Sequence, residues 1–211
     1  MYPIVLIFCA FLILSLFATN WPLKLYHHAV LTKAGKAIGA RPARGSLFAG
    51  VYSEIRAPLA GREVRIRYVE GSMDAIHAAS GLEMRIPLAQ PAVIEFYRVK
   101  LKKAEWGEFK RVFTGDEALD REWVILGNDP ELARQFLRAS ASAHPGAPRH
   151  PLVRLLTNRH IEQILFHSRE MIIRFQKGDP VDSVIEVFRI LPDFFLLPEF
   201  AVESNLEPGD Y

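Results

Sequence analysis

One dense group of acidic side chains, with an arginine among them, has residue types that could do chemistry: Asp116, Glu117, Asp120, Arg121 and Glu122. Carboxylates close together beside a guanidinium can donate and accept protons, so the group is a candidate for general acid–base catalysis. A structural role is simpler, because Thr114-Gly115-Asp116 is typical of a turn and Asp120-Arg121 precedes an apolar run. We predict no catalytic residue and no enzyme. The alternative is a membrane-tethered enzyme or sensor with a site near Asp116 and Asp120.

The seven histidines are poorly spaced for a metal site. His27 and His28 are adjacent, so on a helix they point about 100° apart. His160 and His167 are seven residues apart, which places them on opposite faces of a strand. The sequence has no phosphate-binding loop, dinucleotide-binding or zinc-protease motif, and its single cysteine, Cys9, lies in an apolar segment. We predict no metal and no cofactor.

A set of basic residues lies on predicted strands: Arg65, Arg67, Arg85, Arg98, Lys100, Lys102 and Lys103. Together they could form an anion-binding patch on one face of a sheet. Glu63, Glu83 and Glu95 are interleaved with them, which favours a solvated face with ion pairs. The net charge of the chain is only +2, so we predict no nucleic-acid partner.

An apolar run at the N-terminus dominates the hydropathy pattern. Residues 3–19 carry no charge, and the first charged side chain is Lys24. Seventeen helical residues span about 25 Å, and extension to Leu23 reaches about 30 Å, the thickness of a bilayer core. We predict one transmembrane helix with these anchoring residues: Ile4, Leu6, Phe8, Phe11, Leu14, Phe17 and Trp21. Its apolar surface predicts contacts with other membrane subunits, pigments or lipids.

Basic residues follow the apolar run, with no acid before Glu54: Lys24, Lys33, Lys36, Arg41 and Arg44. The positive-inside rule then places the N-terminus outside and the C-terminal domain in the cytoplasm, at the bacterial inner membrane. The same basic side chains are candidates for contact with anionic lipid head groups. A peripheral module that binds anionic lipid is therefore a second alternative function.

The rest of the sequence predicts the α+β class, with antiparallel strands and two or three short helices in a soluble domain behind the single N-terminal transmembrane helix. The predicted boundaries are 1–38 for the membrane helix and its extension, 39–45 for a linker, 46–192 for the domain and 193–211 for a tail. Alternating or continuous apolar residues predict strands at 47–55, 63–70, 82–88, 92–102 and 122–126. A turn at 57–62 joins the first two strands into a hairpin.

The second half of the domain changes to helical spacing. Asn128-Asp129-Pro130 is a helix-start pattern, and leucines predict a short helix over 152–156. Residues 161–167 and 171–176 are predicted to form a second hairpin that turns at 168–170. A last helix is predicted from Val181, and Pro192 is predicted to end it.

The C-terminal segment combines acidic and large apolar residues. Residues 193–211 contain five acids and no base. An apolar cluster in this segment either packs back on the domain or docks on a partner protein. Both alternatives stay open, and the cluster supplies our candidate partner contacts: Phe194, Phe195, Leu197 and Phe200.

Several short motifs are shared with known sequences: Gly50-Val51-Tyr52, Gly61-Arg62-Glu63-Val64-Arg65-Ile66, Thr114-Gly115-Asp116, Asp120-Arg121 and Asn128-Asp129-Pro130. Their order resembles that of a family of uncharacterised bacterial membrane-anchored proteins, over roughly two-thirds of the chain. The resemblance implies one N-terminal transmembrane helix, two hairpins and a last helix. It implies no known activity.

Together these patterns predict a non-enzymatic accessory or scaffold subunit of a larger membrane protein complex, for example a respiratory or photosynthetic one. The predicted partners are other membrane protein subunits and the lipid bilayer. The prediction depends on the apolar N-terminal run and on the Phe-rich acidic tail, since both offer surfaces that a partner could cover.

Overall fold

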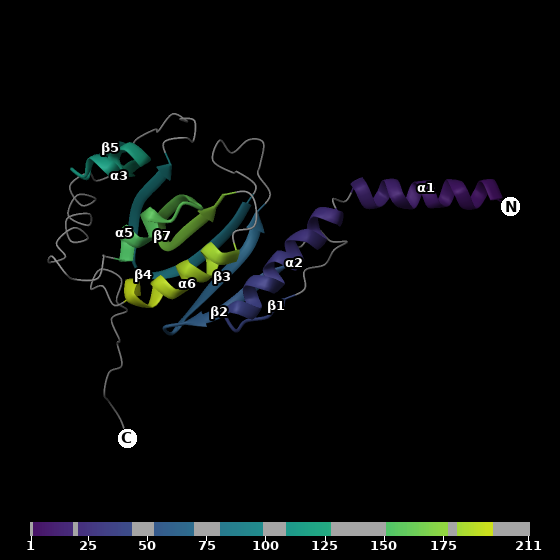
Figure 1. Cartoon of the computed structure of the whole chain (residues 1–211), viewed down its shortest axis with the longest axis horizontal. Coiled ribbons are helices and arrows are strands. Elements are labelled where there is room, and N and C mark those ends of the chain that lie inside the picture. Colours follow the sequence, from purple (N-terminus) through teal and green to yellow (C-terminus); the bar gives the residue numbers. More distant parts are fainter. Residues whose placement is uncertain are drawn as a thin grey trace, which may run out of the picture.

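The computed structural model describes residues 2–18, 21–43, 53–69, 81–98, 109–127, 151–176 and 181–195. In chain order the elements are α1 (Tyr2–Ala18), α2 (Trp21–Ala37), β1 (Pro42–Ala43), β2 (Glu54–Leu59), β3 (Arg62–Val69), β4 (Gly81–Arg98), β5 (Lys110–Val112), α3 (Glu117–Glu122), β6 (Trp123–Gly127), α5 (Pro151–Thr157), β7 (Ile161–Phe175) and α6 (Val181–Phe195). Helices α2 and α6 run beside one another along the sheet, and α1 projects away from it (Figure 1).

The seven strands form one sheet in which the described strand pairs are all antiparallel. The strand order is β1-β2-β3-β4-β6-β5, and β7 also pairs with β4. Strand β4 is 18 residues long, so one of its edges holds β3 along its first part and β6 along its last part. Its other edge pairs with β7 from Glu83 to Tyr97. Strand β4 is therefore the central strand of the sheet, with β3, β6 and β7 as its neighbours.

The hairpin predicted in the first half is confirmed as β2 and β3. Leu59 pairs with Arg62, so the turn consists of Ala60 and Gly61 alone. Their φ angles are +49° and +74°, the conformation of a tight type I′ turn that matches the twist of the strands. Strand β2 begins later than predicted, at Glu54, and residues 44–52 lie outside the described part of the chain.

The second predicted hairpin is changed in one respect: residues 161–175 form one continuous strand, β7, but this strand bends back so that its two ends meet, and the backbone N–H of Gln176 donates to the carbonyl of His160 at 2.8 Å. Ser168 and Glu170, which were predicted to turn, instead pair with Ala92 and Pro87 of β4. The register of the pair shifts between Pro87 and Ala92, where β4 has extra residues. This irregularity changes the alternation of buried side chains in β7, from Ile164 and Phe166 to Met171 and Ile173, so the strand resembles two short ones in the sequence. Strand β4 likewise joins the two strands predicted at 82–88 and 92–102.

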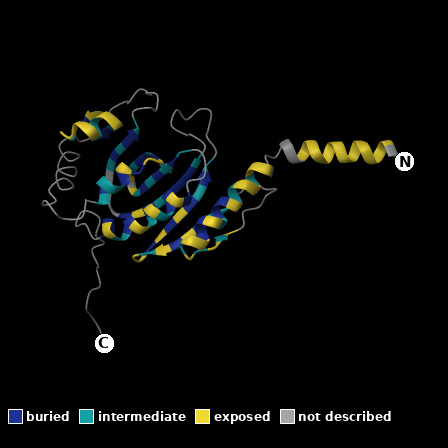
Figure 2. Cartoon of the chain, viewed as in Figure 1, coloured by how far each residue is buried: buried dark blue, intermediate teal, exposed yellow. Residues whose placement is uncertain are grey.

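The core lies between one face of the sheet and helices α2, α5 and α6 (Figure 2). Val64, Ile66 and Tyr68 of β3 are buried on this covered face, while Arg65 between them is exposed. Helix α6 continues through Pro192 to Phe195, so the predicted end at Pro192 is wrong. Burial of Phe194 and Phe195 in the core explains the continuation, since tertiary packing overrides helix propensity.

The predicted fold class is wrong at the N-terminus, where a transmembrane helix was expected. Helix α1 has 17 residues, and among the described helices none is long and apolar enough to cross a membrane. The predicted span of about 30 Å needed one apolar helix to continue to Leu23, whereas the described helix α1 ends at Ala18. The observed fold is an antiparallel sheet with helices on one face. The predicted inner-membrane location and orientation stay predictions.

Candidate functional site

The predicted acidic group forms a capped turn at the start of α3. Asp116 is the N-cap, and its Oδ1 accepts hydrogen bonds from the backbone N–H groups of Ala118 at 2.9 Å and Leu119 at 3.2 Å. Asp120 accepts through Oδ1 from the backbone N–H and the hydroxyl of Thr114, both at 3.0 Å. These local bonds engage both carboxylates with their own segment, the arrangement expected of an N-cap and an Asx-type turn.

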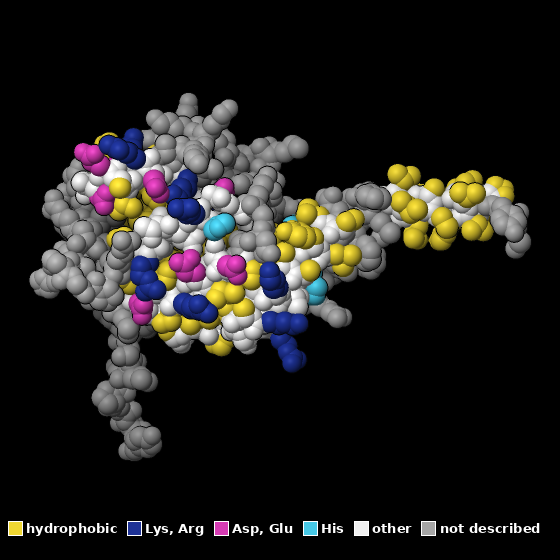
Figure 3. All heavy atoms as spheres, viewed as in Figure 1, with side chains coloured by type: hydrophobic (Ala, Val, Ile, Leu, Met, Phe, Trp, Pro, Cys, Tyr) yellow, Lys and Arg dark blue, Asp and Glu magenta, His cyan; other side chains and the backbone are white. Residues whose placement is uncertain are grey.

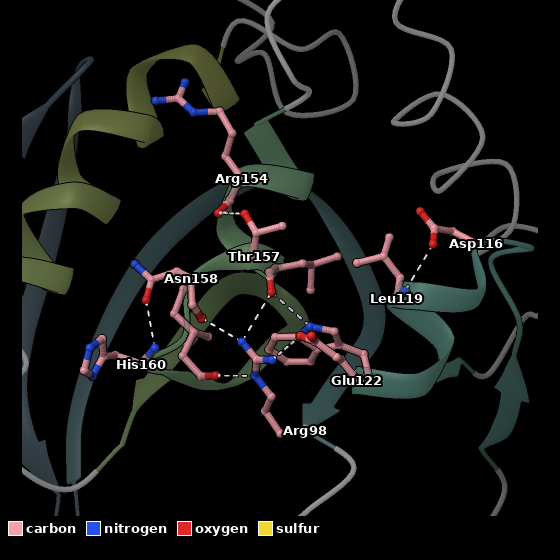
Figure 4. Close-up of polar contacts among 11 residues, drawn as sticks. Arg98, Asp116, Leu119, Glu122, Arg154, Thr157, Asn158 and His160 are labelled. Carbon is pink, nitrogen blue, oxygen red and sulfur yellow. Dashed lines mark hydrogen bonds and ion pairs between the residues drawn. The ribbon is translucent and has the colours of Figure 1, made fainter.

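The C-terminal end of α3 carries Glu122 into a set of polar contacts that we call the Arg98 cluster (Figure 4). Its members are Arg98, Glu122, Trp123 and the backbone carbonyls of Leu156, Asn158 and Ile161. Arg98 donates from Nη1 to Glu122 at 2.5 Å, from Nε to the carbonyl of Ile161 at 3.1 Å and from Nη2 to that of Asn158 at 2.8 Å. Its guanidinium lies 4.5 Å from the ring centroid of Trp123.

The Arg98 cluster joins four parts of the chain. Trp123 Nε1 donates to the carbonyl of Leu156 at 3.0 Å, and Arg98 Nη2 reaches the same carbonyl at 3.4 Å. The cluster thus ties the ends of β4, α3 and β6 to the segment between α5 and β7. The side chain of Arg98 is only 14% exposed, and carbonyls are neutral acceptors. This arrangement positions elements and leaves little of the guanidinium open to a ligand.

A second polar group, the Glu83 cluster, lies on the opposite face of the sheet. It consists of Glu83 and Arg85 on β4, Arg67 on β3, and Gln163, Glu170 and Arg174 on β7. Oε1 of Glu83 accepts from Arg85 Nε at 2.5 Å and lies 3.7 Å from Arg67 Nη2. Oε2 accepts from Arg174 Nε at 3.2 Å. The Glu83 side chain is 1% exposed, whereas the three arginine side chains are 21–40% exposed.

The predicted basic patch is therefore divided between the two faces. Arg65, Arg67 and Arg85 share the open face, where Arg65 pairs with Glu63 at 3.0 Å. Arg98 points to the covered face, beside the buried Trp123. Lys100, Lys102 and Lys103 lie outside the described residues. Arg174, which the prediction missed, comes from a strand 91 residues from Glu83 and carries no local signal of that contact.

The N-terminal half of α2 packs on the sheet through histidines. The rings of His27 and Tyr68 are stacked, with centroids 3.7 Å apart and an interplanar angle of 9°. Burial lowers the pKa of His27 below its ordinary value, because desolvation penalises the charged imidazolium. Next to it, His28 Nδ1 lies 2.8 Å from the hydroxyl of Ser53. Both contacts hold α2 against the end of the sheet.

The basic residues predicted to bind lipid head groups do not gather on one side of α2. At about 100° per residue, Lys24 and Lys33 lie on opposite sides of the helix, and Lys36 lies about 120° from Lys24. Arg41 is exposed beyond the helix, and Arg44 lies outside the described residues.

The residues predicted as partner contacts in the tail include two that pack internally. Phe194 and Phe195 are 0% and 7% exposed, and they belong to the core cluster. Their prediction as partner contacts is corrected, since they pack on the chain's own sheet and helices. The guanidinium of Arg62 lies 4.4 Å from the ring centroid of Phe195. Leu197 and Phe200 lie outside the described residues.

Helix α1 presents the largest run of exposed apolar residues in the described part of the chain. Figure 3 shows hydrophobic side chains along its visible face. Among the predicted anchoring residues five are 64–73% exposed: Ile4, Leu6, Phe8, Phe11 and Leu14. The side chains of Phe17 and Trp21 are outside the description.

Comparisons with known proteins inform the fold. No protein-family model matches the sequence, and no curated protein matches it. Among solved structures, the mycobacterial trehalose monomycolate transport factor A, TtfA, is similar in fold, with a TM-score of 0.51 and 10% sequence identity. The match covers 78% of this chain and 92% of that one. At this identity the similarity shows a shared fold alone.

Proposed function

We propose that this protein is an accessory or scaffold subunit of a larger membrane assembly, and that α1 is the element that associates with the other subunits. The observation that carries the proposal is the exposure of α1. Nine large apolar side chains between Ile4 and Leu14 are 50–73% exposed in the isolated chain.

Covering such an apolar surface with a partner is energetically favourable. Fully burying one large apolar side chain contributes about 1.5–3 kcal/mol, so the helix as a whole has much to gain from contact with an apolar surface. No residue of α1 is charged. The surface that receives it therefore has to be apolar as well, as the surfaces of membrane protein subunits are.

The folded domain fits an accessory role. Its fold is similar to that of a protein named as a transport factor, TtfA. The acidic group at the start of α3 supports the enzyme alternative poorly, because Asp116 and Asp120 are bonded to their own turn. The lipid-binding alternative is weakened by the spread of Lys24, Lys33 and Lys36 around α2.

The proposal can be tested by co-purification. The full chain, tagged at its C-terminus, is extracted from native membranes in mild detergent, and co-purifying proteins are measured by quantitative mass spectrometry. We expect a stoichiometric set of membrane proteins. Recovery of the wild-type chain alone would contradict the proposal.

Two variants locate the contact. Phe8→Lys with Phe11→Lys places two charges on α1, and we expect it to lose the partners. Phe113→Lys is the matched control, because Phe113 is also exposed, at 58%, but lies outside α1. Loss of partners in the control and not in the α1 variant would place the contact on the domain and contradict the role of α1.

A further inference from the structure

We propose that the open face of the sheet binds a phosphate group at the Glu83 cluster, with Arg67 and Arg85 as its main ligands. This site is independent of the proposed docking of α1. It lies on β3, β4 and β7, on the face opposite the helices that cover the core.

Positive charge gathers around Glu83, whose carboxylate faces three guanidiniums, those of Arg67, Arg85 and Arg174, while Glu170 pairs with Arg85. In addition, Arg65 is directly opposite Arg85 in the strand register. Like charges that face one another across strands are unfavourable. An anion near Arg67 and Arg85 would reduce this repulsion.

Arg67 has the donors to bind it. The other two arginines direct Nε to Glu83, and their Nη1 groups donate to Glu170 and Gln163. By contrast, Arg67 makes no hydrogen bond to the described residues: its contact with Glu83 is 3.7 Å long, and its buried Nε has no hydrogen-bond partner. An unsatisfied buried donor is uncommon in folded proteins, so Arg67 is the arginine of the cluster that gains most from an added acceptor.

The geometry suits a single oxyanion with several acceptor oxygens. Arg67 Nη2 and Arg85 Nε lie beside the same oxygen of Glu83, so the two guanidiniums are neighbours. Their side chains are 40% and 31% exposed, which gives solvent and ligand access to the outer ends. Guanidiniums bind phosphate through parallel N–H donors, and a buried carboxylate beneath them fixes their positions. The source of the phosphate is either a soluble phosphate ester or a lipid head group.

The first experiment titrates the full chain, in mild uncharged detergent, with inorganic phosphate by isothermal calorimetry against chloride of equal ionic strength. Arg67→Gln removes the proposed ligand. Arg56→Gln is the matched control, because Arg56 lies on the same face but is already paired with Glu54 at 2.6 Å. We expect saturable binding that weakens about tenfold or more in Arg67→Gln and about twofold or less in Arg56→Gln.

Two results overturn the proposal. One is the absence of phosphate binding beyond that of chloride in the wild-type chain. The other is equal weakening in both variants, which would indicate only general charge attraction. Circular dichroism and thermal unfolding of Arg67→Gln establish that the variant is folded, and Arg67→Lys keeps the charge without the planar donors. We expect Arg67→Lys to bind phosphate more weakly than the wild type.

An experiment with lipid vesicles distinguishes a lipid head group from a soluble phosphate ester as the source of the phosphate. Binding of the wild-type chain to phosphatidylglycerol vesicles is compared with binding to phosphatidylcholine vesicles, and the difference is measured again in Arg67→Gln. A preference for phosphatidylglycerol that Arg67→Gln abolishes assigns a lipid head group. Equal preference in both proteins, with phosphate binding retained in the wild type, assigns a soluble phosphate ester.

Discussion

The two polar clusters use the same residue types in opposite ways. In the Arg98 cluster one largely buried cation is surrounded by acceptors, which are three carbonyls and one carboxylate. In the Glu83 cluster one buried acid is surrounded by three cations. Carbonyls and one carboxylate occupy the donors of the single guanidinium of Arg98, whereas one carboxylate cannot occupy all the donors of three guanidiniums. The first arrangement locks elements together, and the second leaves a surface with binding capacity.

The largest effect should come from Glu83. Glu83→Gln removes the charge that faces three guanidiniums, and we expect the free energy of unfolding to fall by about 3 kcal/mol in urea denaturation followed by circular dichroism. The control is Glu63→Gln, because the Glu63–Arg65 pair is about half exposed on both sides. We expect a loss below about 1 kcal/mol there. Equal losses would show that burial of Glu83 does not distinguish the cluster.

A smaller loss should follow from Arg98→Lys. Lysine keeps the positive charge but cannot reach three carbonyls and Glu122 with a planar fork, so at least one buried carbonyl loses its partner. We expect about 2 kcal/mol in the same assay. Arg121→Lys, at a pair with Glu117 that is 80% and 85% exposed, should change stability by less than about 0.5 kcal/mol. A loss in the control as large as in Arg98→Lys would contradict the locking role.

The cap of α3 tests how far the Arg98 cluster depends on its neighbours. Asp116→Ala removes the N-cap of the helix that carries Glu122, and we expect a loss of about 1 kcal/mol, whereas Asp116→Asn should keep most of the stability. A double-mutant cycle with Glu122→Gln gives the coupling. Additive effects would mean that α3 and the Arg98 cluster are independent.

The smallest predicted effect is at His27. This residue stacks on Tyr68, which is next to Arg67 on β3 but faces the covered side of the sheet. Because burial lowers the pKa of His27 below 6.5, the folded state binds its proton less well than the unfolded state. The stability that depends on neutral His27 is therefore complete above pH 6.5 and is lost as the pH falls through that value toward the lower folded pKa.

Chemical unfolding of the wild type and of His27→Gln at about pH 7.5 and pH 5.5 measures this effect. We expect a smaller loss on acidification in the variant. Phosphate binding at pH 7.5 should be the same in both proteins, since the covered and open faces are separate. An identical loss of stability on acidification in both proteins would show that His27 is not the source of the pH dependence.

Local signals in the sequence were sufficient for much of the fold. The β2–β3 hairpin follows from alternation and a glycine turn, and α5 and the start of α6 follow from leucine and valine spacing. Strands β4 and β7 were each predicted as two shorter segments, because the register shift between Pro87 and Ala92 and the bend of β7 interrupt the local pattern. The spanning helix was wrong because hydropathy alone does not set the length of a helix, and α1 as described has 17 residues.

In the candidate sites, too, contacts between residues near in sequence were easier to predict than contacts between distant ones. The turn at Thr114-Gly115-Asp116 was considered from the sequence, whereas the N-cap role of Asp116 and the bonds of Asp120 to this turn were not, although all the partners are within six residues. Glu83 was predicted as one of several interleaved acids on a solvated face. Its burial depends on Arg174, which is 91 residues away, and a single sequence contains no signal for such a contact.

The pairing of β4 with β7 sets the order of events during synthesis. Glu83 leaves the ribosome 91 residues before its partner Arg174, so at about 5–20 residues per second it waits roughly 5–18 seconds. During that time one edge of an 18-residue strand lacks its final neighbour. The nascent chain therefore passes through a stage at which a chaperone, or an unintended strand, can compete for that edge.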